Sequence, residues 1–331
     1  MKLLPTLLIA AGIAAMVVLV VHFGAGAVGA ALLAVGALGF AAVTAIHVTL
    51  IAGMGLAWAA LLPDTRPWVA IWGRFVRDAG SEVLPLSQVG GYVLGARAIA
   101  LAGVPATRSA ASTIVDVTLE FVGQLAYTSL GLAWLLHLHT AGVAPQTVLL
   151  GLAVATCLAL AFVVVQRRGL RYVDRVVHIF GQGWAEKTAA GAAALHQALE
   201  TIYRRRGGIW LSFSIHLLCW VVSASEIWVA LRFAGQNLPF GSVVVIESLV
   251  YAIRATAFFV PNSLGIQEGA YILLGGAFGL SPEMALALSL LKRARDLTIC
   301  LPVIALWQAV EGGRLWRRFA AKTPASIVGR D

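Results

Sequence analysis

Most of the chain consists of long apolar runs, and short segments between them carry most of the charges. A helix needs about 20 apolar residues to cross the hydrocarbon core of a bilayer. By that measure the pattern predicts membrane-spanning helices at residues 3–23, within 27–62, and at 111–136, 147–166, 208–231, 238–260 and 282–310. The second run is too long for one crossing, so we expect its Gly- and Ala-rich start to lie at the membrane interface.

Composition supports the same interpretation. Hydrophobic residues make up 60% of the chain and charged residues only 12%, whereas a soluble domain usually carries about 25% charged residues. Mean hydropathy is +0.88. A chain with so little polar surface cannot cover a hydrophobic core in water, which excludes a soluble single-domain fold. The expected fold class is therefore all-α, a polytopic integral membrane helix bundle.

Basic residues alternate between the connections. Arg66, Arg74 and Arg77 follow the second run, and further arginines follow the fourth and last runs, whereas the other connections lack Lys and Arg. Cytoplasmic loops of membrane proteins carry an excess of Lys and Arg. We therefore expect a multi-pass protein of the bacterial inner membrane with both termini in the cytoplasm. The net charge of +9 then reflects topology, and nucleic acid is not an expected partner.

A single transmembrane domain is expected at residues 1–320, with a disordered cytoplasmic tail at 321–331. The one sizeable connection lies at about 167–207. Within it, residues 184–203 are Ala-rich, which predicts an amphipathic helix on the inner leaflet. Its charged residues are spaced one helical turn apart, at His196, Glu200 and Arg204.

Two apolar segments, at residues 84–103 and 260–279, are interrupted by Pro and Gly near their starts. Broken backbone at membrane depth is tolerated only where protein or water satisfies its polar groups. Paired broken segments in the two halves of a chain also point to a transport site. We therefore predict two re-entrant segments, with breaks at Pro85, Ser87, Gly90, Gly91, Pro261, Ser263, Gly265 and Gln267.

The two broken segments also suggest an internal repeat. Sliding one over the other aligns Pro85 with Pro261, Ser87 with Ser263, Gly103 with Gly279, and Glu120 with Asp296. Few residues are identical in this alignment. The pattern therefore indicates a repeat at the level of helices and breaks, without demonstrating a duplication.

Several charges fall inside the predicted spans. Asp116 and Glu120 lie four residues apart, so they share one helix face, and a bare charge facing lipid would cost several kcal/mol. We expect these acids to pair with bases of the last span, around the two breaks. An inert ion-pair network that locks helix packing remains the alternative for any single pair. The candidate path for a lipid head group comprises Asp116, Glu120, Arg254, Glu268, Lys292, Arg295 and Asp296.

Other motifs of site chemistry are absent from the sequence. Cys157, Cys219 and Cys300 each stand alone in an apolar run, so neither a metal site nor a disulfide framework is indicated. Glu226, near His216, forms a second polar patch that we interpret as core hydrogen bonding. Neither a phosphate-binding GxxxxGK[ST] loop nor an HExxH or GxSxG motif occurs. We expect no cofactor, metal ion or catalytic residue, and no enzymatic activity.

Residues 260–268 read VPNSLGIQE and are followed by Gly-Ala-Tyr. With LPLSQVGG at 84–91, the run from Asp116 to Glu120, and ALALSLLKRAR at 285–295, the chain resembles the lysylphosphatidylglycerol synthase transmembrane-region family. It is most similar to the branch associated with hopanoid biosynthesis. The late hallmark of that family is Pro-Gly-x-Leu-Gly-x-x-Glu, and Asn262 stands where Gly is frequent. The resemblance covers nearly the whole chain.

The resemblance implies a helical membrane domain that moves an amphipathic lipid between leaflets, and in the hopanoid branch toward the outer membrane. The soluble aminoacyl-transferase domain of full synthases has no counterpart in these residues, so lipid aminoacylation is not expected. Two alternatives stay open: a membrane-embedded enzyme with Asp116 or Glu120 as base, and a structural partner of a lipid-biosynthesis complex. Expected partners are a membrane lipid and proteins of lipid biosynthesis or export, in an unspecified oligomeric state.

Overall fold

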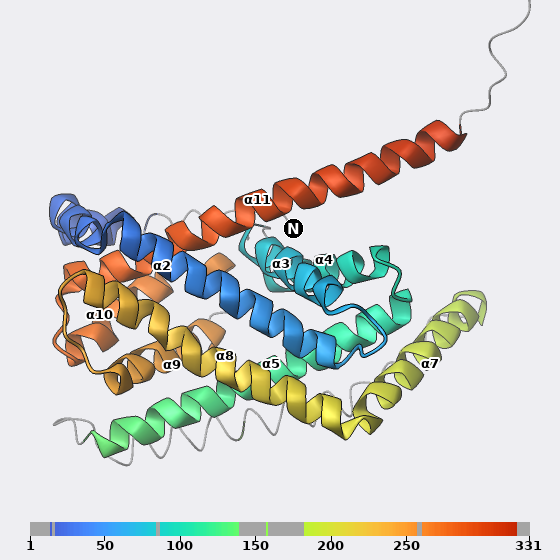
Figure 1. Cartoon of the computed structure of the whole chain (residues 1–331), viewed down its shortest axis with the longest axis horizontal. Coiled ribbons are helices and arrows are strands. Elements are labelled where there is room, and N and C mark those ends of the chain that lie inside the picture. Colours follow the sequence, from blue (N-terminus) through green and yellow to red (C-terminus); the bar gives the residue numbers. More distant parts are fainter. Residues whose placement is uncertain are drawn as a thin grey trace, which may run out of the picture.

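The computed structural model describes residues 14, 17–83, 87–138, 157, 182–256 and 260–322. Every element in these ranges is helical, which confirms the all-α fold class. Three helices are long and apolar enough to cross a membrane, namely α2 (Ala25–Ala60), α5 (Ala106–His137) and α8 (Arg206–Phe233). The protein is therefore a multi-pass membrane protein, and Figure 1 shows how these long helices are arranged.

The remaining elements are shorter or more charged. They are α3 (Pro67–Val83), α4 (Ser87–Leu101), α7 (Gln182–Arg204), α9 (Phe240–Thr256), η1 (Pro261–Ser263), α10 (Ile266–Ala277) and α11 (Pro282–Lys322). Three predicted spans correspond to α2, α5 and α8, and the predicted span at 282–310 lies within helix α11. The predicted span at 238–260 contains α9, and residues 257–259 of it lie outside the described residues. Nearly all of the predicted spans at 3–23 and 147–166 lie outside the described residues.

Helices α2 and α8 pack against each other in antiparallel directions. A Cβ atom on Gly39 would come within 3.0 Å of the Phe233 side chain, and one on Gly208 within 2.8 Å of the Ala60 carbonyl oxygen. Glycines at these positions allow the two helix backbones to approach closely. This pair forms much of the main hydrophobic core, together with parts of α9, α10 and α11.

A break divides α2 near its start. Gly36 has φ 69° and ψ 172°, a conformation that only glycine adopts readily. The segment before the break turns away from the rest of α2 in Figure 1. The first part of α2 is therefore a separate segment, as predicted. Its position at the membrane interface stays a prediction.

Two helical hairpins enter the bundle from opposite ends. The α3–α4 hairpin follows the C-terminal end of α2, and the α9–α10 hairpin follows the C-terminal end of α8. Because α2 and α8 are antiparallel, these two ends lie on opposite sides of the bundle, as Figure 1 shows. With 17 residues each, α3 and α9 are about 26 Å long. Helices of this length fall short of the hydrocarbon core of a bilayer, about 30 Å, and re-entrance from each membrane face stays a prediction.

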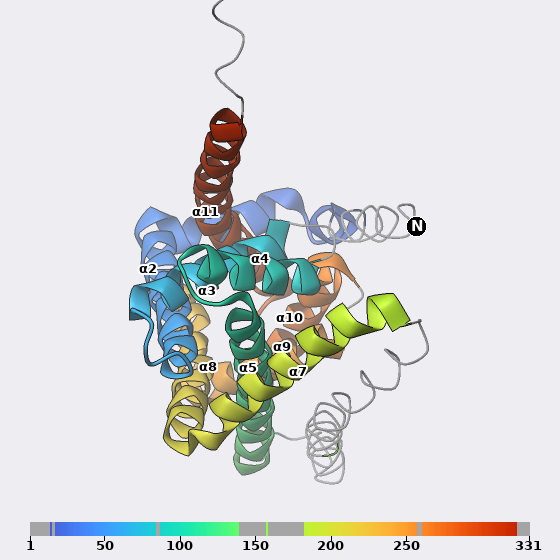
Figure 2. The same ribbon diagram turned by 90° about the vertical axis from the view of Figure 1, so that its right-hand side faces the viewer.

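The predicted amphipathic helix is confirmed as a helix within α7. Leu199 and Ile202 are buried in a core cluster shared with α5, and Figure 2 shows α7 crossing the outside of α5. In the same view α11 rises out of the bundle, because its 41 residues make a helix about 61 Å long. This helix continues through Lys322, and the rest of the predicted tail lies outside the described residues.

The order of helices supports the predicted repeat without confirming it. Each half contains a long helix, a hairpin of two shorter helices, and another long helix. Helices α5 and α11 begin at Ala106 and Pro282, which is the spacing that also separates Pro85 from Pro261. Common ancestry of the two halves stays a prediction.

Candidate functional site

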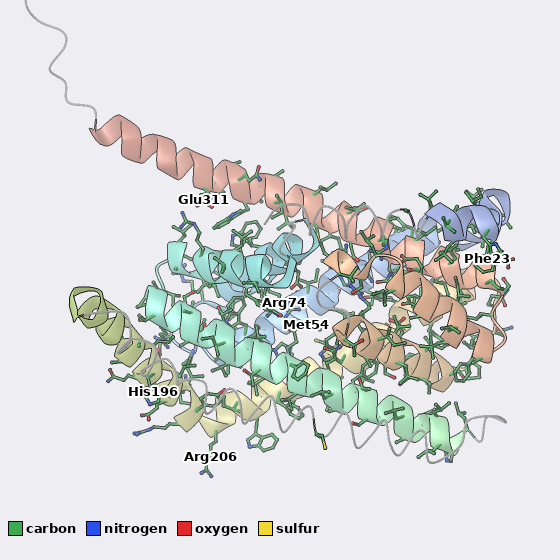
Figure 3. All side chains as sticks on the ribbon, turned by 180° about the vertical axis from the view of Figure 1, so that it is seen from behind. Phe23, Met54, Arg74, His196, Arg206 and Glu311 are labelled. Atoms are coloured by element: carbon green, nitrogen blue, oxygen red, sulfur yellow. The ribbon has the colours of Figure 1, made fainter. Side chains whose placement is uncertain are left out.

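A cavity of about 490 Å³ lies between the two hairpins, in the interior of the bundle. Figure 3 shows two of its lining residues, Met54 and Arg74, midway between Phe23 at one end and Arg206 at the other. The wall is unusually polar for membrane depth. Its ionisable lining residues include His47, Arg74, Arg77, Asp78, Glu82, Glu120, Glu226, Arg254, Arg295 and Asp296.

The first charged network joins α3 to α5. Arg74 donates two hydrogen bonds to the Glu120 carboxylate, at 2.8 and 2.9 Å, and a third at 2.8 Å to Asp78. Arg77 donates to Asp116 at 2.7 Å and also to Glu120. Both guanidinium groups are about 4% exposed. These two-pronged contacts suit the planar guanidinium group and fix α3 against α5.

This network corrects two expectations. The acids of α5 do not pair with bases of the last span; they pair with Arg74 and Arg77 of α3. Those two arginines are not loop residues that mark the cytoplasmic side, because they are buried inside the bundle. Because charged residues interrupt the hydrophobic run of α3, its sequence predicts a connection between spans.

His216 completes the α5 network from α8. Its Nε2 atom lies 3.0 Å from the second carboxylate oxygen of Asp116, and both side chains are fully buried. The other ring nitrogen, Nδ1, has no hydrogen-bond partner in the described structure. His216 was assigned to a separate polar patch with Glu226, which is wrong, because the two side chains belong to different networks.

A second network joins α2, α8 and α11. Arg295 donates to Glu226 and, at 2.6 Å, to its neighbour Asp296. His47 of α2 lies between these acids, with Nδ1 2.8 Å from Glu226 and Nε2 3.6 Å from Asp296. All four residues line the cavity. Glu226 is therefore part of the cavity wall and not an isolated core hydrogen bond.

A third network lies behind the wall, between α9, α10 and α11. Lys292 donates to Glu247 at 2.6 Å and to the Tyr251 hydroxyl at 3.3 Å, while the Tyr271 hydroxyl donates to Glu247. Lys292 and Glu247 are 1% and 0% exposed. A buried charge of this kind needs a partner at all times, which fits a role in holding α9 and α11 together.

Glu268 holds the turn of the second hairpin. Its carboxylate accepts hydrogen bonds from the Gly265 N–H at 2.8 Å, the Ser289 hydroxyl at 3.1 Å and the Arg293 guanidinium at 2.6 Å. Arg293 also donates to the Asn262 carbonyl at 3.3 Å. The carboxylate thus caps the N-terminus of α10, where a negative charge is favourable. Its contacts are those of a structural clamp.

The backbone of this turn explains its residues. Asn262, Ser263 and Gly265 have φ values of 52°, 48° and 79°, and residues other than Gly rarely adopt this left-handed region. Asn tolerates it better than most residues, which explains why Asn262 fits this turn. Gln267, another predicted break residue, donates at 2.8 Å to the Ser289 hydroxyl and ties α10 to α11.

Among the predicted break residues of the first hairpin, Gly91 serves the packing of two helices. Pro85 lies outside the described residues, and α4 begins at Ser87 and includes Gly90. A Cβ atom on Gly91 would lie 2.0 Å from the Ser81 hydroxyl oxygen and 2.4 Å from the Arg77 carbonyl oxygen. Gly91 is therefore required for close packing of α4 on α3.

Two ionisable groups in the cavity wall lack an ion-pair partner among the described residues. The Oε2 atom of Glu82 is buried and accepts no hydrogen bond. The Arg254 guanidinium lies 5.7 Å from the centre of the Tyr251 ring, a weak contact for a cation at membrane depth. Glu82 was not among the predicted site residues, since it falls in the segment taken for a connection.

The structure thus divides the predicted head-group path. Glu120, Arg254, Arg295 and Asp296 line the cavity. The other three members, Asp116, Glu268 and Lys292, are engaged in ion pairs outside its lining. The sequence analysis missed His47, Asp78 and Glu82. One sequence pattern could have identified α3 as part of the site. Polar residues spaced three and four apart form one face of this helix, at Arg74, Arg77, Asp78 and Ser81.

Outside the bundle, Asp64 and Arg108 form an exposed pair at 2.7 Å. The hydrogen bond from Arg108 and its charge lower the pKa of Asp64 below its ordinary value. No group of three or more His, Cys, Asp or Glu residues within the described ranges could hold a metal ion.

Comparison with known proteins gave one match. The family model of the lysylphosphatidylglycerol synthase TM region matches residues 7–304, which is most of the chain. No curated protein and no solved structure matches this chain.

Proposed function

We propose that this chain, which belongs to the lysylphosphatidylglycerol synthase TM region family, moves an amphipathic lipid between the two leaflets of its membrane. The lipid head group would pass through the cavity while the apolar body stays in the bilayer. A hopanoid is the substrate class that the resemblance of its motifs favours. The observation that carries the proposal is the cavity between the opposed hairpins, with charged side chains in its wall.

The dimensions and chemistry of the cavity support this function. Its volume of about 490 Å³ falls in the usual range of ligand sites, about 300–1,000 Å³. A polar head group in hydrocarbon loses its hydrogen bonds to water, and polar side chains in the wall would replace them. Exposed apolar side chains on α2 and α11, such as Leu33 and Leu306, give the outer surface of the bundle an apolar character that suits lipid tails.

Transport would proceed without covalent change of the lipid. A carboxylate that serves as a base must be free to accept a proton from its substrate. Asp116 and Glu120 each accept hydrogen bonds from Arg77, and Glu120 also from Arg74, so fixed donors already occupy both carboxylates. This argues against the membrane-embedded enzyme with either acid as base.

The orientation follows from the basic end of the bundle. Arg66 follows α2, Arg108 lies near the start of α5, and Arg205 and Arg206 precede α8, so all lie at the end that the α3–α4 hairpin enters. By the positive-inside rule this end would face the cytoplasm of a bacterial inner membrane. Lipid-biosynthesis or export proteins would then meet the protein at either face.

Reconstitution tests the proposed path without altering any charge. The full chain would be placed in liposomes containing a fluorescent phosphatidylglycerol or a fluorescent hopanoid, and dithionite quenching would measure movement between leaflets. Ala255 lines the cavity near the end of α9, so Ala255→Trp should reduce movement to the rate of protein-free vesicles. Leu306→Trp, at a 54% exposed position of α11, is the matched control and should retain it.

Two outcomes would overturn the proposal. If wild-type protein moves neither lipid, or if Ala255→Trp and wild type move lipid equally, the cavity is not a head-group path. Mass spectrometry of the recovered lipid distinguishes the enzyme alternative, since a changed lipid mass would indicate covalent modification.

A further inference from the structure

Glu82 and Arg254 carry opposite charges and stand out against an otherwise paired wall. One carboxylate oxygen of Glu82 is buried without any hydrogen-bond donor. Arg254 makes no ion pair within the described part of the chain, and its guanidinium lies over the face of Tyr251. Both line the same cavity. Asp296 of α11 and Arg254 of α9 both act electrostatically on Glu82, and no ion pair joins Glu82 to Arg254 in the described structure.

The positions of Glu82 and Arg254 in the fold determine what a contact between them would do to the cavity. Glu82 is the penultimate residue of α3, at the tip of the first hairpin, and Arg254 lies in the last turn of α9, at the tip of the second. The two hairpins enter from opposite ends of the bundle. A contact between Glu82 and Arg254 would therefore join the two tips and divide the cavity between them.

The charges that surround Glu82 leave Arg254 as its available partner. On α11, Arg293 is held by Glu268, and Arg295 is held by Glu226 and Asp296. On its own helix α3, Asp78 is held by Arg74. His47 of α2 lies between Glu226 and Asp296, and Tyr92 of α4 lies under the Arg77 guanidinium.

We propose that Glu82 is a proton-binding site and that its ionisation closes a gate with Arg254 between the hairpin tips, which couples protons to the proposed lipid movement. A protonated Glu82 is neutral, so it can remain buried without a cation and leave the tips apart. On losing its proton to water, Glu82 becomes a buried carboxylate that requires a partner, and Arg254 supplies it. The inference rests on the proposed function for what is moved, but the gate itself can be tested separately.

The gate is tested by the distance between the two hairpins. After replacement of the three native cysteines, one spin label would be attached to Val89→Cys, near the start of α4 and 67% exposed. The other would be attached to Leu273→Cys of α10, which is 76% exposed and outside the cavity lining. In reconstituted protein, double electron–electron resonance should then show shorter distances at high pH than at low pH. Glu82→Gln should show the long distance at both pH values, because a neutral amide cannot ionise.

Further variants separate the gate from a general structural effect. Arg254→Lys keeps a cation and should retain the pH-dependent distance, whereas Arg254→Gln should lose it. Asp64→Asn removes an exposed carboxylate in another part of the chain and should behave as wild type. A distance that does not change with pH, or a pH response that persists in Glu82→Gln, would overturn the gate.

Lipid movement under an imposed pH gradient then tests the coupling. Wild-type protein should move the fluorescent lipid at a rate that depends on the gradient, and Glu82→Gln should lose that dependence. Gradient-independent movement that is equal in both proteins refutes the coupling while the proposed function stands. Tips that respond to pH in a wild-type protein that moves no lipid refute the proposed function while the gate stands.

Discussion

The two helical hairpins have similar shapes but are held by different chemistry. In the first, glycines allow α3 and α4 to touch: a Cβ atom on Gly95 would lie 2.7 Å from the Arg77 Cβ atom, and one on Gly91 would overlap Ser81. In the second, an ion pair between Glu268 and Arg293 pins the turn before α10 to α11. The first hairpin is thus stiffened by close packing, and the second by a charged clamp.

The difference shows that buried charges in this bundle serve more than one purpose. The arginines of the first hairpin point outward from it to Asp116 and Glu120 of α5, so they fix the hairpin as a unit in the bundle. Glu268 and Arg293 instead tie a single turn, the one before α10, to α11. Neither set is free to follow a passing head group, whereas Glu82 and Arg254 at the tips have no fixed partner.

The largest expected loss of stability follows from Arg77→Ala. This change removes the arginine partner of Asp116, which is 0% exposed and keeps only the contact with His216. Breaking a buried pair in this way costs about 3–5 kcal/mol. Unfolding in detergent, followed by tryptophan fluorescence, would measure the loss. If Arg77→Ala unfolds at the same midpoint as wild type, the first hairpin does not depend on its ion pairs with α5.

Glu268→Ala should cause the next largest loss of stability, about 3 kcal/mol, because Arg293 and the Gly265 N–H would lose their acceptor. The matched control is Gly269→Ala in the same turn of α10, where an added Cβ meets no atom within 4 Å. Thermal unfolding of both variants would compare them. An equal midpoint for the two would show that the charged clamp does not hold the second hairpin.

Gly91→Ala should destabilise the first hairpin by about 1–3 kcal/mol, the usual cost of overpacking. The added methyl group would overlap the Ser81 hydroxyl and the Arg77 carbonyl, so α4 must move away from α3. Hydrogen exchange of α3 and α4 amides would detect the loosening. Faster exchange confined to α9 and α10 would contradict the assignment of close packing to the first hairpin.

The smallest effect is expected for Asp64→Asn, outside both hairpins. Arg108 lowers the pKa of Asp64, so the pair contributes stability above the unfolded pKa of Asp64, near 3.8, and loses it as the pH falls through the lower folded value. Because the pair is exposed and screened, no measurable change in the unfolding midpoint is expected at pH 7. A clear loss at pH 7 that disappears at pH 3 would show that even exposed pairs contribute here.

Sequence patterns predicted the helical class, three of the long helices and the turn around Pro261, because these depend on local composition and spacing. They also predicted that Asp116 and Glu120 must be buried on one face. They could not supply the partners. A short charged stretch such as Arg74 to Asp78 looks like a loop until packing shows it buried, and the unpaired state of Glu82 depends on where every neighbouring charge finds its partner.

The central claim is that a lipid head group enters the cavity between the hairpin tips. The most direct test is photocrosslinking in liposomes with phosphatidylglycerol and a hopanoid polyol, each bearing a diazirine in its head group, followed by mass spectrometry of the labelled peptides. The account predicts labels on the cavity-lining segments around Glu82, Arg254 and Arg295. Labels confined to the ends of the bundle, near Phe23 and Arg206, would contradict it.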